Sequence, residues 1–279
     1  MSENQQKNAF TFRQFEHEGW QMVAQGYHDH FAGLTAQSIE PLLNVLSISN
    51  GTSLLDVACG PGYVAAAAAL RGARVLGVDF SAVMVEAASR LYPELAFKQA
   101  DAEALELPDA SFDAVSMNFG LLHLDQPEKA LSECYRVLKP GGRFAFTVWA
   151  APADSRAFAI VLEAIAEHGD PHRPLPPGPP FFRFSDRAES EAALKASGFA
   201  EIAFTLLPMI WELPTPEHLF KAFLTGTPRT GGLLRAQSPA DLAAIEKAVS
   251  GEAGTYVQGG TVRVPMACVL AAARKPPSR

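Results

Sequence analysis

The chain has 279 residues, of which 48% are hydrophobic and 19% charged, and its net charge of −7 makes it a poor partner for nucleic acid. No apolar run reaches the ~20 residues of a membrane span, and the polar start, Met1 to Lys7, lacks a hydrophobic signal region. Three separated cysteines, Cys59, Cys134 and Cys268, argue against a disulfide framework or a cysteine zinc site, so a cytoplasmic protein is expected.

The N-terminal part of the chain is predicted to be helical. Residues 11–34 space their apolar side chains three to four positions apart, as in an amphipathic helix. The side chains that carry this pattern are Phe12, Phe15, Trp20, Val23, Tyr27 and Phe31. A second helix is expected over residues 36–46.

Strands and helices then alternate up to Trp149. Strands are predicted at 53–58, 74–78, 96–99, 112–118 and 143–149, with helices at 63–70, 81–91 and 127–138 and a turn at 139–142. This alternation indicates an α/β fold with a doubly wound, mostly parallel sheet.

The composition changes after Trp149. Residues 1–150 hold 10 Lys and Arg against 17 Asp and Glu, whereas residues 151–279 hold 13 of each and 15 of the 21 prolines. Helices are expected at 154–168, 189–197 and within 215–250, and strands at 199–207 and 261–273. These two strands should complete the same sheet, which makes seven strands in all.

A single domain over 1–279 is therefore expected. Its parts are N-terminal helices (1–50), a cofactor-binding core (51–150), lid segments (151–189 and 212–258) and closing strands (199–207 and 261–273).

Polar groups follow the predicted strands at their C-terminal ends, where open α/β sheets bind ligands. The first group is Asp56-Val-Ala-Cys-Gly60-Pro-Gly62, whose glycines allow a tight turn and a close approach of backbone to ligand. Asp79 ends the second strand and is suited to ribose hydroxyls. The others are Asp101-Ala102 and Asn118-Phe119-Gly120.

A nicotinamide dinucleotide is one alternative, because Gly60-Pro-Gly62-Tyr-Val-Ala65 satisfies the dinucleotide fingerprint. Asp56 argues against it, since a carboxylate four residues before Gly60 suits an amino group and repels a pyrophosphate. Asp101 and Asn118 add polar strand ends, as a nucleoside with an amino-acid tail requires.

These residues resemble a family. Leu54-Leu-Asp-Val-Ala-Cys-Gly-Pro-Gly62, Gly77-Val-Asp-Phe-Ser81, Ala100-Asp-Ala102 and Arg136-Val-Leu-Lys-Pro-Gly-Gly142 look like a class I S-adenosylmethionine-dependent methyltransferase. Within that superfamily the chain is similar to the small-molecule methyltransferases related to ubiquinone and menaquinone biosynthesis enzymes. The resemblance is dense over residues 50–150 and specific for cofactor and fold, not for the acceptor.

The resemblance implies roles for individual residues. Asp56, Ala58 and Gly60 would hold the methionine end, Gly62 in the same turn would also belong to the cofactor site, and Asp79 would bind the ribose. The adenine would lie against Phe80 and Met84, with Asp101 and Ala102 at its edge. Asn118 and Phe119 would supply backbone near the methionine moiety. Family members often carry two histidines where this chain has Leu122-His123, so only the second is present.

Two residues are candidates for catalysis, and each has a structural alternative. His123 is expected near the transferred methyl group, as a base or as a packing residue. Tyr27 either caps the cofactor or is a core aromatic. Cys59 is interpreted as a small turn residue, and no metal site is predicted, since Gly169 and Pro171 break the helix between His168 and His172.

The predicted function is methyl transfer from S-adenosylmethionine to a small acceptor by in-line displacement, which releases S-adenosylhomocysteine. The alternatives are a cofactor-binding protein without catalysis and an NAD(P)-dependent oxidoreductase. The lid segments are expected to cover a mostly apolar acceptor pocket. Their aromatic residues are Phe158, Phe181, Phe182, Phe184, Trp211, Phe220 and Phe223. The sequence leaves the acceptor and the oligomeric state open.

Overall fold

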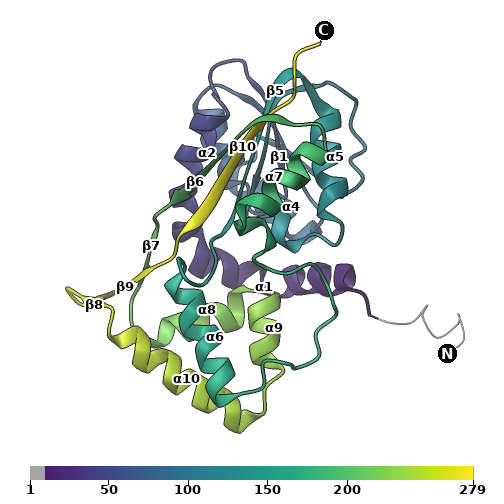
Figure 1. The fold of residues 1–279 in the computed structure, drawn as a ribbon. Coiled ribbons are helices and arrows are strands. Elements are labelled where there is room, and N and C mark those ends of the chain that lie inside the picture. Colours follow the sequence, from purple (N-terminus) through teal and green to yellow (C-terminus); the bar gives the residue numbers. More distant parts are fainter. Residues whose placement is uncertain (1–9, 279) are drawn as a thin grey trace, which may run out of the picture.

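A seven-stranded sheet forms the centre of the protein in the computed structural model, which describes residues 10–278 (Figure 1). The strand order is β3-β2-β1-β4-β5-β10-β6, and β10 lies antiparallel between β5 and β6 while the first five strands are parallel. The strands are β1 (Ser53–Val57), β2 (Arg74–Asp79), β3 (Ala96–Gln99), β4 (Phe112–Asn118), β5 (Leu138–Trp149), β6 (Ala200–Leu207) and β10 (Cys268–Arg274). The predicted doubly wound, mostly parallel sheet is confirmed. The polar start, Met1 to Lys7, lies outside the described residues.

Helices cover both faces of this sheet. α2 (Ile39–Val45) and α3 (Tyr63–Leu70) share an apolar cluster with β1, β4, β5 and β10 on one face. α5 (Pro127–Val137) and α7 (Arg187–Ala196) belong to the larger cluster on the other face. α4 (Ala82–Leu91) lies against β2 and β3. Short 3-10 turns occur at η2 (Ala36–Ser38), η3 (Leu121–His123) and η4 (Arg183–Ser185).

Helix α1 (Phe12–Thr35) lies between the sheet and a layer of further helices (Figure 1). Thr11 begins α1 with a capping box, in which its side chain accepts from the Gln14 backbone N–H. Against α8 (Glu217–Gly226) the contact is close, because a Cβ at Gly26 would stand 2.3 Å from the Thr225 carbonyl oxygen. The layer consists of α6 (Arg156–His168), α8 (Glu217–Gly226), α9 (Arg229–Arg235) and α10 (Pro239–Gly254).

The prediction of one closing strand over residues 261–273 is wrong in one respect. This segment forms two strands, which lie in different sheets. β9 (Thr261–Pro265) pairs with β7 (Ile210–Leu213) and β8 (Val257–Gln258) in a separate sheet, and β10 alone enters the main sheet. Pro265 ends β9, since proline has no N–H for a further ladder bond.

The predicted turn at 139–142 lies within β5. Pairing with β4 jumps from Leu138 to Arg143 at this point, so the four residues bulge out of the ladder. Gly141 has a φ of 80°, which the bulge requires and which glycine adopts without strain.

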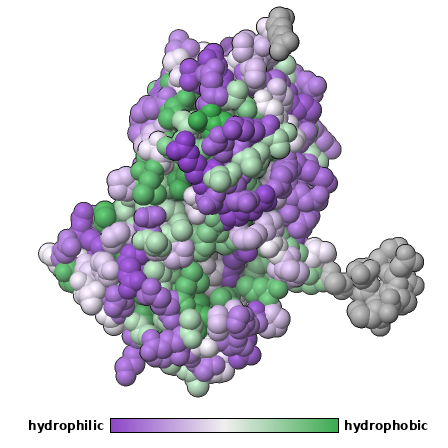
Figure 2. Space-filling model, in the orientation of Figure 1, coloured by the Kyte–Doolittle hydropathy of each residue, from purple (hydrophilic) through white to green (hydrophobic). Residues whose placement is uncertain are grey.

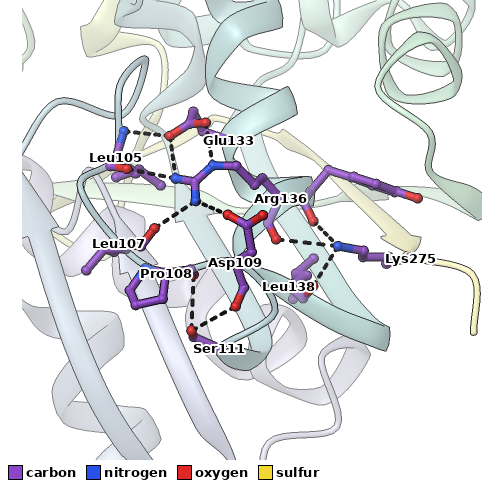
Figure 3. Close-up of polar contacts among 10 residues, drawn as sticks. Leu105, Leu107, Pro108, Asp109, Ser111, Glu133, Arg136, Leu138 and Lys275 are labelled. Carbon is purple, nitrogen blue, oxygen red and sulfur yellow. Dashed lines mark hydrogen bonds and ion pairs between the residues drawn. The ribbon is translucent and has the colours of Figure 1, made fainter. Parts of the chain in front are cut away.

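A polar network fixes the loop that follows β3 (Figure 3). Arg136 on α5 donates to the carbonyl oxygens of Leu105 and Leu107, each at 2.7 Å, and it pairs with Asp109. Glu133 orients the guanidinium from one turn earlier and accepts from the Leu105 N–H at 2.7 Å. The two α5 side chains thus hold residues 105–109, which follow Asp101 and Ala102 in the same loop.

Lys275 stabilises the end of the same helix (Figure 3). Its ammonium group donates to the carbonyl oxygens of Tyr135 and Leu138, both at 2.8 Å, and to that of Arg136 at 3.4 Å. These carbonyls lie at the C-terminus of α5, where the helix provides no partner of its own and a cation is favourable.

The surface mixes polar and apolar residues (Figure 2). Large apolar side chains that are exposed among residues 10–278 lie on separate elements rather than in one patch. They are Phe10, Met22, Leu70, Leu91, Leu206 and Val257. No helix in this part of the chain is long and apolar enough to cross a bilayer.

Candidate functional site

A cavity of about 980 Å³, including its mouth, lies between α1 and the C-terminal ends of β1, β2 and β4. It collects nearly all of the site residues that the sequence predicts, and both candidate catalytic residues. They are Tyr27, Asp56, Ala58, Gly60, Asp79, Phe80, Met84, Asp101, Ala102, Asn118, Phe119 and His123.

Gly62 is the predicted residue that does not line this cavity. It precedes α3 with a φ of 85°, and a Cβ there would stand 2.8 Å from the Phe97 ring. Its contribution is therefore to the shape of the turn and not to a ligand contact. Ala58 adopts a φ of 52° without being glycine, which places backbone strain at the start of the same turn.

Asp56 ends β1 as a buried carboxylate with one free oxygen. Ser116 donates to Oδ1 at 2.8 Å, whereas Oδ2 has no partner among the described residues. Burial raises the pKa of Asp56 to about 7, although the Ser116 hydrogen bond opposes the shift. An unpartnered buried carboxylate oxygen at a cavity wall suits a cationic ligand group.

Asp79 is buried at the end of β2, where its carboxylate arranges the backbone around it. Oδ2 accepts from the Gly60 N–H and Oδ1 from the Ser81 N–H, both at 2.9 Å. Burial raises the pKa of Asp79 to about 6, while these backbone bonds oppose the rise. Each oxygen keeps a second lone pair, so the group can still accept from ligand hydroxyls.

Asp101 differs from its predicted surroundings, because its carboxylate already has two protein partners. Arg13 of α1 pairs with Oδ2, and the Glu103 N–H donates to Oδ1 at 2.9 Å. Arg13 also bonds Glu103 at 3.1 Å. The arginine therefore ties α1 to the loop beyond β3 at one end of the cavity.

Asn118 and Phe119 close β4 with their polar groups engaged. The Asn118 carbonyl oxygen Oδ1 accepts from Ser38 at 2.8 Å and also from Thr147. The Phe119 N–H donates to Thr147, and its ring lies 4.1 Å from that of Trp149. Phe119 thus presents a fixed aromatic surface beside the cavity.

A second cavity, of about 410 Å³, continues from the first beneath the helical layer. The two share Trp20, Tyr27, Phe119 and His123 in their walls. The second is lined mainly by aromatic rings, completed by α9. Its further lining residues are Phe31, Trp149, Phe158, Phe181, Thr227, Pro228, Arg229 and Thr230.

The predicted lid aromatics divide into two groups. Phe158 and Phe181 line the second cavity, and Phe182 packs at 5.2 Å against Phe158. The remaining four are buried at 3% exposure or less. They are Phe184, Trp211, Phe220 and Phe223.

Charged groups meet at the junction of the two cavities. His123 Nδ1 lies 3.0 Å from Oε2 of Glu16, a carboxylate that is only 1% exposed. The other oxygen of Glu16 has no hydrogen-bond partner among the described residues and lies 3.9 Å from Arg229 Nε. Burial lowers the pKa of Arg229, and the Glu16 charge opposes this shift.

Tyr27 is half-buried in the same junction. Its hydroxyl group lies 3.5 Å from Thr35 Oγ1, and its ring stacks on Phe31 at 5.7 Å. Burial raises the pKa of Tyr27, so the phenol stays protonated at neutral pH.

The sequence reasoning missed Arg13, Glu16 and Arg229. For Glu16 a signal exists, since it stands four residues after Phe12 and four before Trp20, on the apolar stripe of α1. A carboxylate in that position must find a buried partner. No cluster of three metal-ligating side chains occurs within residues 10–278.

Residues 55–146 match the family described as Methyltransferase domain. A demethylmenaquinone methyltransferase of Clavibacter sepedonicus is 40% identical over 122 residues, which cover 42% of this chain and 50% of that protein. A malonyl-[acyl-carrier protein] O-methyltransferase of Erwinia billingiae is 35% identical over 168 residues, covering 55% and 66%. The chain spans about half the length of the first of these curated relatives.

Solved structures share the fold. The YcgJ protein of Bacillus subtilis has a TM-score of 0.56 at 20% identity, with 86% of this chain and 99% of that chain covered. A phosphoethanolamine N-methyltransferase 2 of Haemonchus contortus, in complex with S-adenosyl-L-methionine, has a TM-score of 0.60 at 20% identity, with 97% and 61% covered.

Proposed function

Because the chain belongs to the class I S-adenosylmethionine-dependent methyltransferases, with the methyltransferase domain at residues 55–146, we propose that it methylates a small organic acceptor. The carrying observation is the pair of joined cavities, which share Trp20, Tyr27, Phe119 and His123. One cavity takes the methyl donor and the other the acceptor. The methyl group is transferred at the junction where the two cavities meet.

The first cavity fits S-adenosylmethionine. The free oxygen of Asp56 is the partner that an ammonium group requires, and Asp79 retains lone pairs for ribose hydroxyls. Phe80 and Met84 provide the apolar wall for the adenine. When bound, the cofactor supplies a methyl group on a positively charged sulfur.

The edge of the adenine is assigned to the segment that begins with Asp101 and Ala102. Arg13 already pairs with the Asp101 carboxylate, so the amino group of the base shares this carboxylate with the guanidinium. The pairing keeps residue 101 in place before the ligand arrives, which reduces the ordering cost of binding.

The second cavity suits an acceptor with a flat, apolar body. Trp149, Phe158 and Phe181 offer ring faces and edges, and the charged groups lie at the end nearest the first cavity. An acceptor held there presents its reacting atom at the junction. Holding both reactants in one orientation and excluding water account for much of the expected rate.

His123 is proposed as the group that receives a proton from the acceptor, and Tyr27 as a neutral wall beside the methyl group. His123 lines both cavities, and Tyr27 packs on Phe31 and lies beside Thr35. A base is required only where the acceptor must lose a proton to become a good nucleophile.

Calorimetry with S-adenosylhomocysteine and mass spectrometry of the ligand carried through purification test the cofactor. We expect binding of this nucleoside and none of NAD(H); the reverse result establishes an oxidoreductase. Methyl transfer from labelled S-adenosylmethionine to a panel of small aromatic compounds then tests catalysis. Tight cofactor binding with no turnover across the panel favours a binding protein without catalysis.

The variant Phe181→Ala tests the role of the second cavity independently of the first. This ring lines the second cavity and not the first. The variant should raise KM for the acceptor about tenfold or more, since an aromatic contact contributes on the order of 1–3 kcal/mol, while S-adenosylhomocysteine affinity stays within twofold. Phe184→Leu, a substitution in the core away from both cavities, is the control.

A further inference from the structure

We propose that Glu16 is the positioning residue for His123, and that these two residues with Arg229 select an acceptor that gives up a proton when it is methylated. Such an acceptor is a hydroxyl compound or another weak acid, and not an amine. This inference rests on the proposed methyl transfer and specifies its acceptor.

Glu16 holds one edge of the imidazole. Its Oε2 lies 3.0 Å from Nδ1, and a carboxylate can only accept there, so Nδ1 carries the proton. The remaining nitrogen, Nε2, then holds the lone pair and has no hydrogen-bond partner among the described residues. A bound acceptor is the partner that this nitrogen lacks.

Aromatic rings prevent the imidazole from turning away. Trp20 meets it edge to face, with ring centroids 4.8 Å apart at 84°, and Phe181 lies at 6.0 Å and 75°. Because His123 belongs to the wall of both cavities, the lone pair is fixed beside the place where donor and acceptor meet.

Arg229 sets the sign of the charge that the second cavity accepts. Its guanidinium donates to the carbonyl oxygens of Leu122 and Pro179, at 3.3 and 3.0 Å, and is 19% exposed. Arg229 lines the second cavity whereas Glu16 lines only the first, so the charge that faces an acceptor there is positive. It disfavours an ammonium group and stabilises an oxygen that is becoming negative. The nearby Glu16 balances Arg229 before the reaction.

The transfer balances with these groups. As the acceptor O–H bond breaks, its proton goes to His123 Nε2, and the resulting imidazolium is paired with Glu16. An oxygen lone pair forms the new O–C bond while the C–S bond breaks and its electron pair stays on sulfur.

The position of the ring proton tests the role of Glu16. Nitrogen NMR of histidine-labelled protein, saturated with S-adenosylhomocysteine, should show His123 with its proton on Nδ1, the minor form of free histidine in water. Glu16→Leu should abolish this signal, and the exposed Glu18→Leu on the same helix should keep it. A wild-type proton on Nε2 overturns the proposal.

Matched probes test the acceptor class. We expect 2-naphthol to bind the S-adenosylhomocysteine complex at least tenfold more tightly than 2-naphthylmethylammonium, by fluorescence titration. Arg229→Met should reduce this preference to threefold or less. Equal or tighter binding of the ammonium probe to the wild type, or binding of neither probe, contradicts the inferred class.

Kinetics separate positioning from structure. Where a hydroxyl acceptor is turned over, Glu16→Gln should lower kcat about 10–100-fold with KM and cofactor affinity within twofold, and Glu18→Gln should change none of these. A wild-type protein that fails to bind S-adenosylhomocysteine refutes the proposed function itself. Intact cofactor binding with an unaffected Glu16→Gln enzyme refutes only the role of Glu16.

Discussion

Ser116 donates to one oxygen of Asp56 and leaves the other without a partner, so a carboxylate at the end of a central strand is satisfied on one side only. The unpartnered oxygen of Asp56 favours the binding of a cationic group in the cavity. If this oxygen pairs with the ammonium group of the cofactor, as proposed, cofactor affinity depends on the protonation of Asp56, because burial raises its pKa to about 7.

The sign of that dependence follows from the two buried carboxyl groups. Asp56 and Asp79 have pKa values of about 7 and about 6, above the ordinary value of 3.8. Between pH ~4 and ~7 the folded protein holds protons that the unfolded chain has released, so the contribution of these groups to ligand-free stability decreases as the pH rises. Charging Asp56 conversely strengthens its pairing with an ammonium group.

Affinity for S-adenosylhomocysteine should therefore increase as the pH rises from 5.5 to 8, by up to about tenfold per unit below pH 7. Calorimetry at several pH values measures it. Asp56→Asn should weaken binding at pH 8 and flatten the profile. A wild-type affinity that does not vary with pH contradicts the ammonium assignment.

Asp79→Asn tests the ribose contact. Affinity for S-adenosylhomocysteine should fall by about 1–3 kcal/mol, through lost acceptance from the hydroxyls and a looser Gly60 turn. Asp113→Asn is the matched control, because Asp113 also accepts from a backbone N–H, that of Ser53, but outside both cavities. Unchanged affinity in Asp79→Asn refutes the ribose assignment.

Two glycines of α1 should respond in opposite ways to alanine. Gly26→Ala places a Cβ 2.3 Å from the backbone oxygen of Thr225, so the helices must separate, at a cost of about 1–3 kcal/mol of unfolding free energy. Gly33→Ala meets no atom within 4 Å and should stabilise the helix by about 0.5–1 kcal/mol. Denaturant titration measures both, and equal effects would contradict the packing described.

Arg136→Met and Lys275→Met should both reduce stability by roughly 1–3 kcal/mol, because each removes several hydrogen bonds to carbonyl oxygens. Only Arg136→Met should also weaken S-adenosylhomocysteine binding, since Arg136 positions the loop that carries Asp101 and Ala102. Thermal denaturation and calorimetry on the two variants separate these effects. Equal losses of affinity would remove the distinction.

The core over residues 51–150 was largely predictable from the sequence. Periodicity located its strands, and polar residues at strand ends located the cavity, because parallel strands bring such residues to one edge. Gly62 shows the limit of this reasoning, since its sequence position suggests a ligand contact while its conformation serves the turn.

The part of the chain after Trp149 was less predictable, because the walls of the second cavity depend on packing between distant segments. Phe158 and Phe220 look alike in sequence, yet one lines a cavity and the other is core. Arg13, Glu16 and Arg229 reach the site across 88 residues or more of chain, or from separate helices, and no local pattern encodes such pairings. The split of residues 261–273 between two sheets is of the same kind.

Helix α1 stands in the wall of both cavities, together with Phe119 and His123, while the remaining walls come from separate stretches of chain. Apart from α1, the first cavity is built from residues 56–125, and the second draws Trp149 to Thr230 from the later part. If the second cavity takes the acceptor, as proposed, substitutions in that later part can alter what is methylated without touching the groups that hold the donor. Related proteins could therefore differ in the acceptor they prefer while they keep the same donor site. The same separation would allow the acceptor cavity to be redesigned with combinatorial libraries.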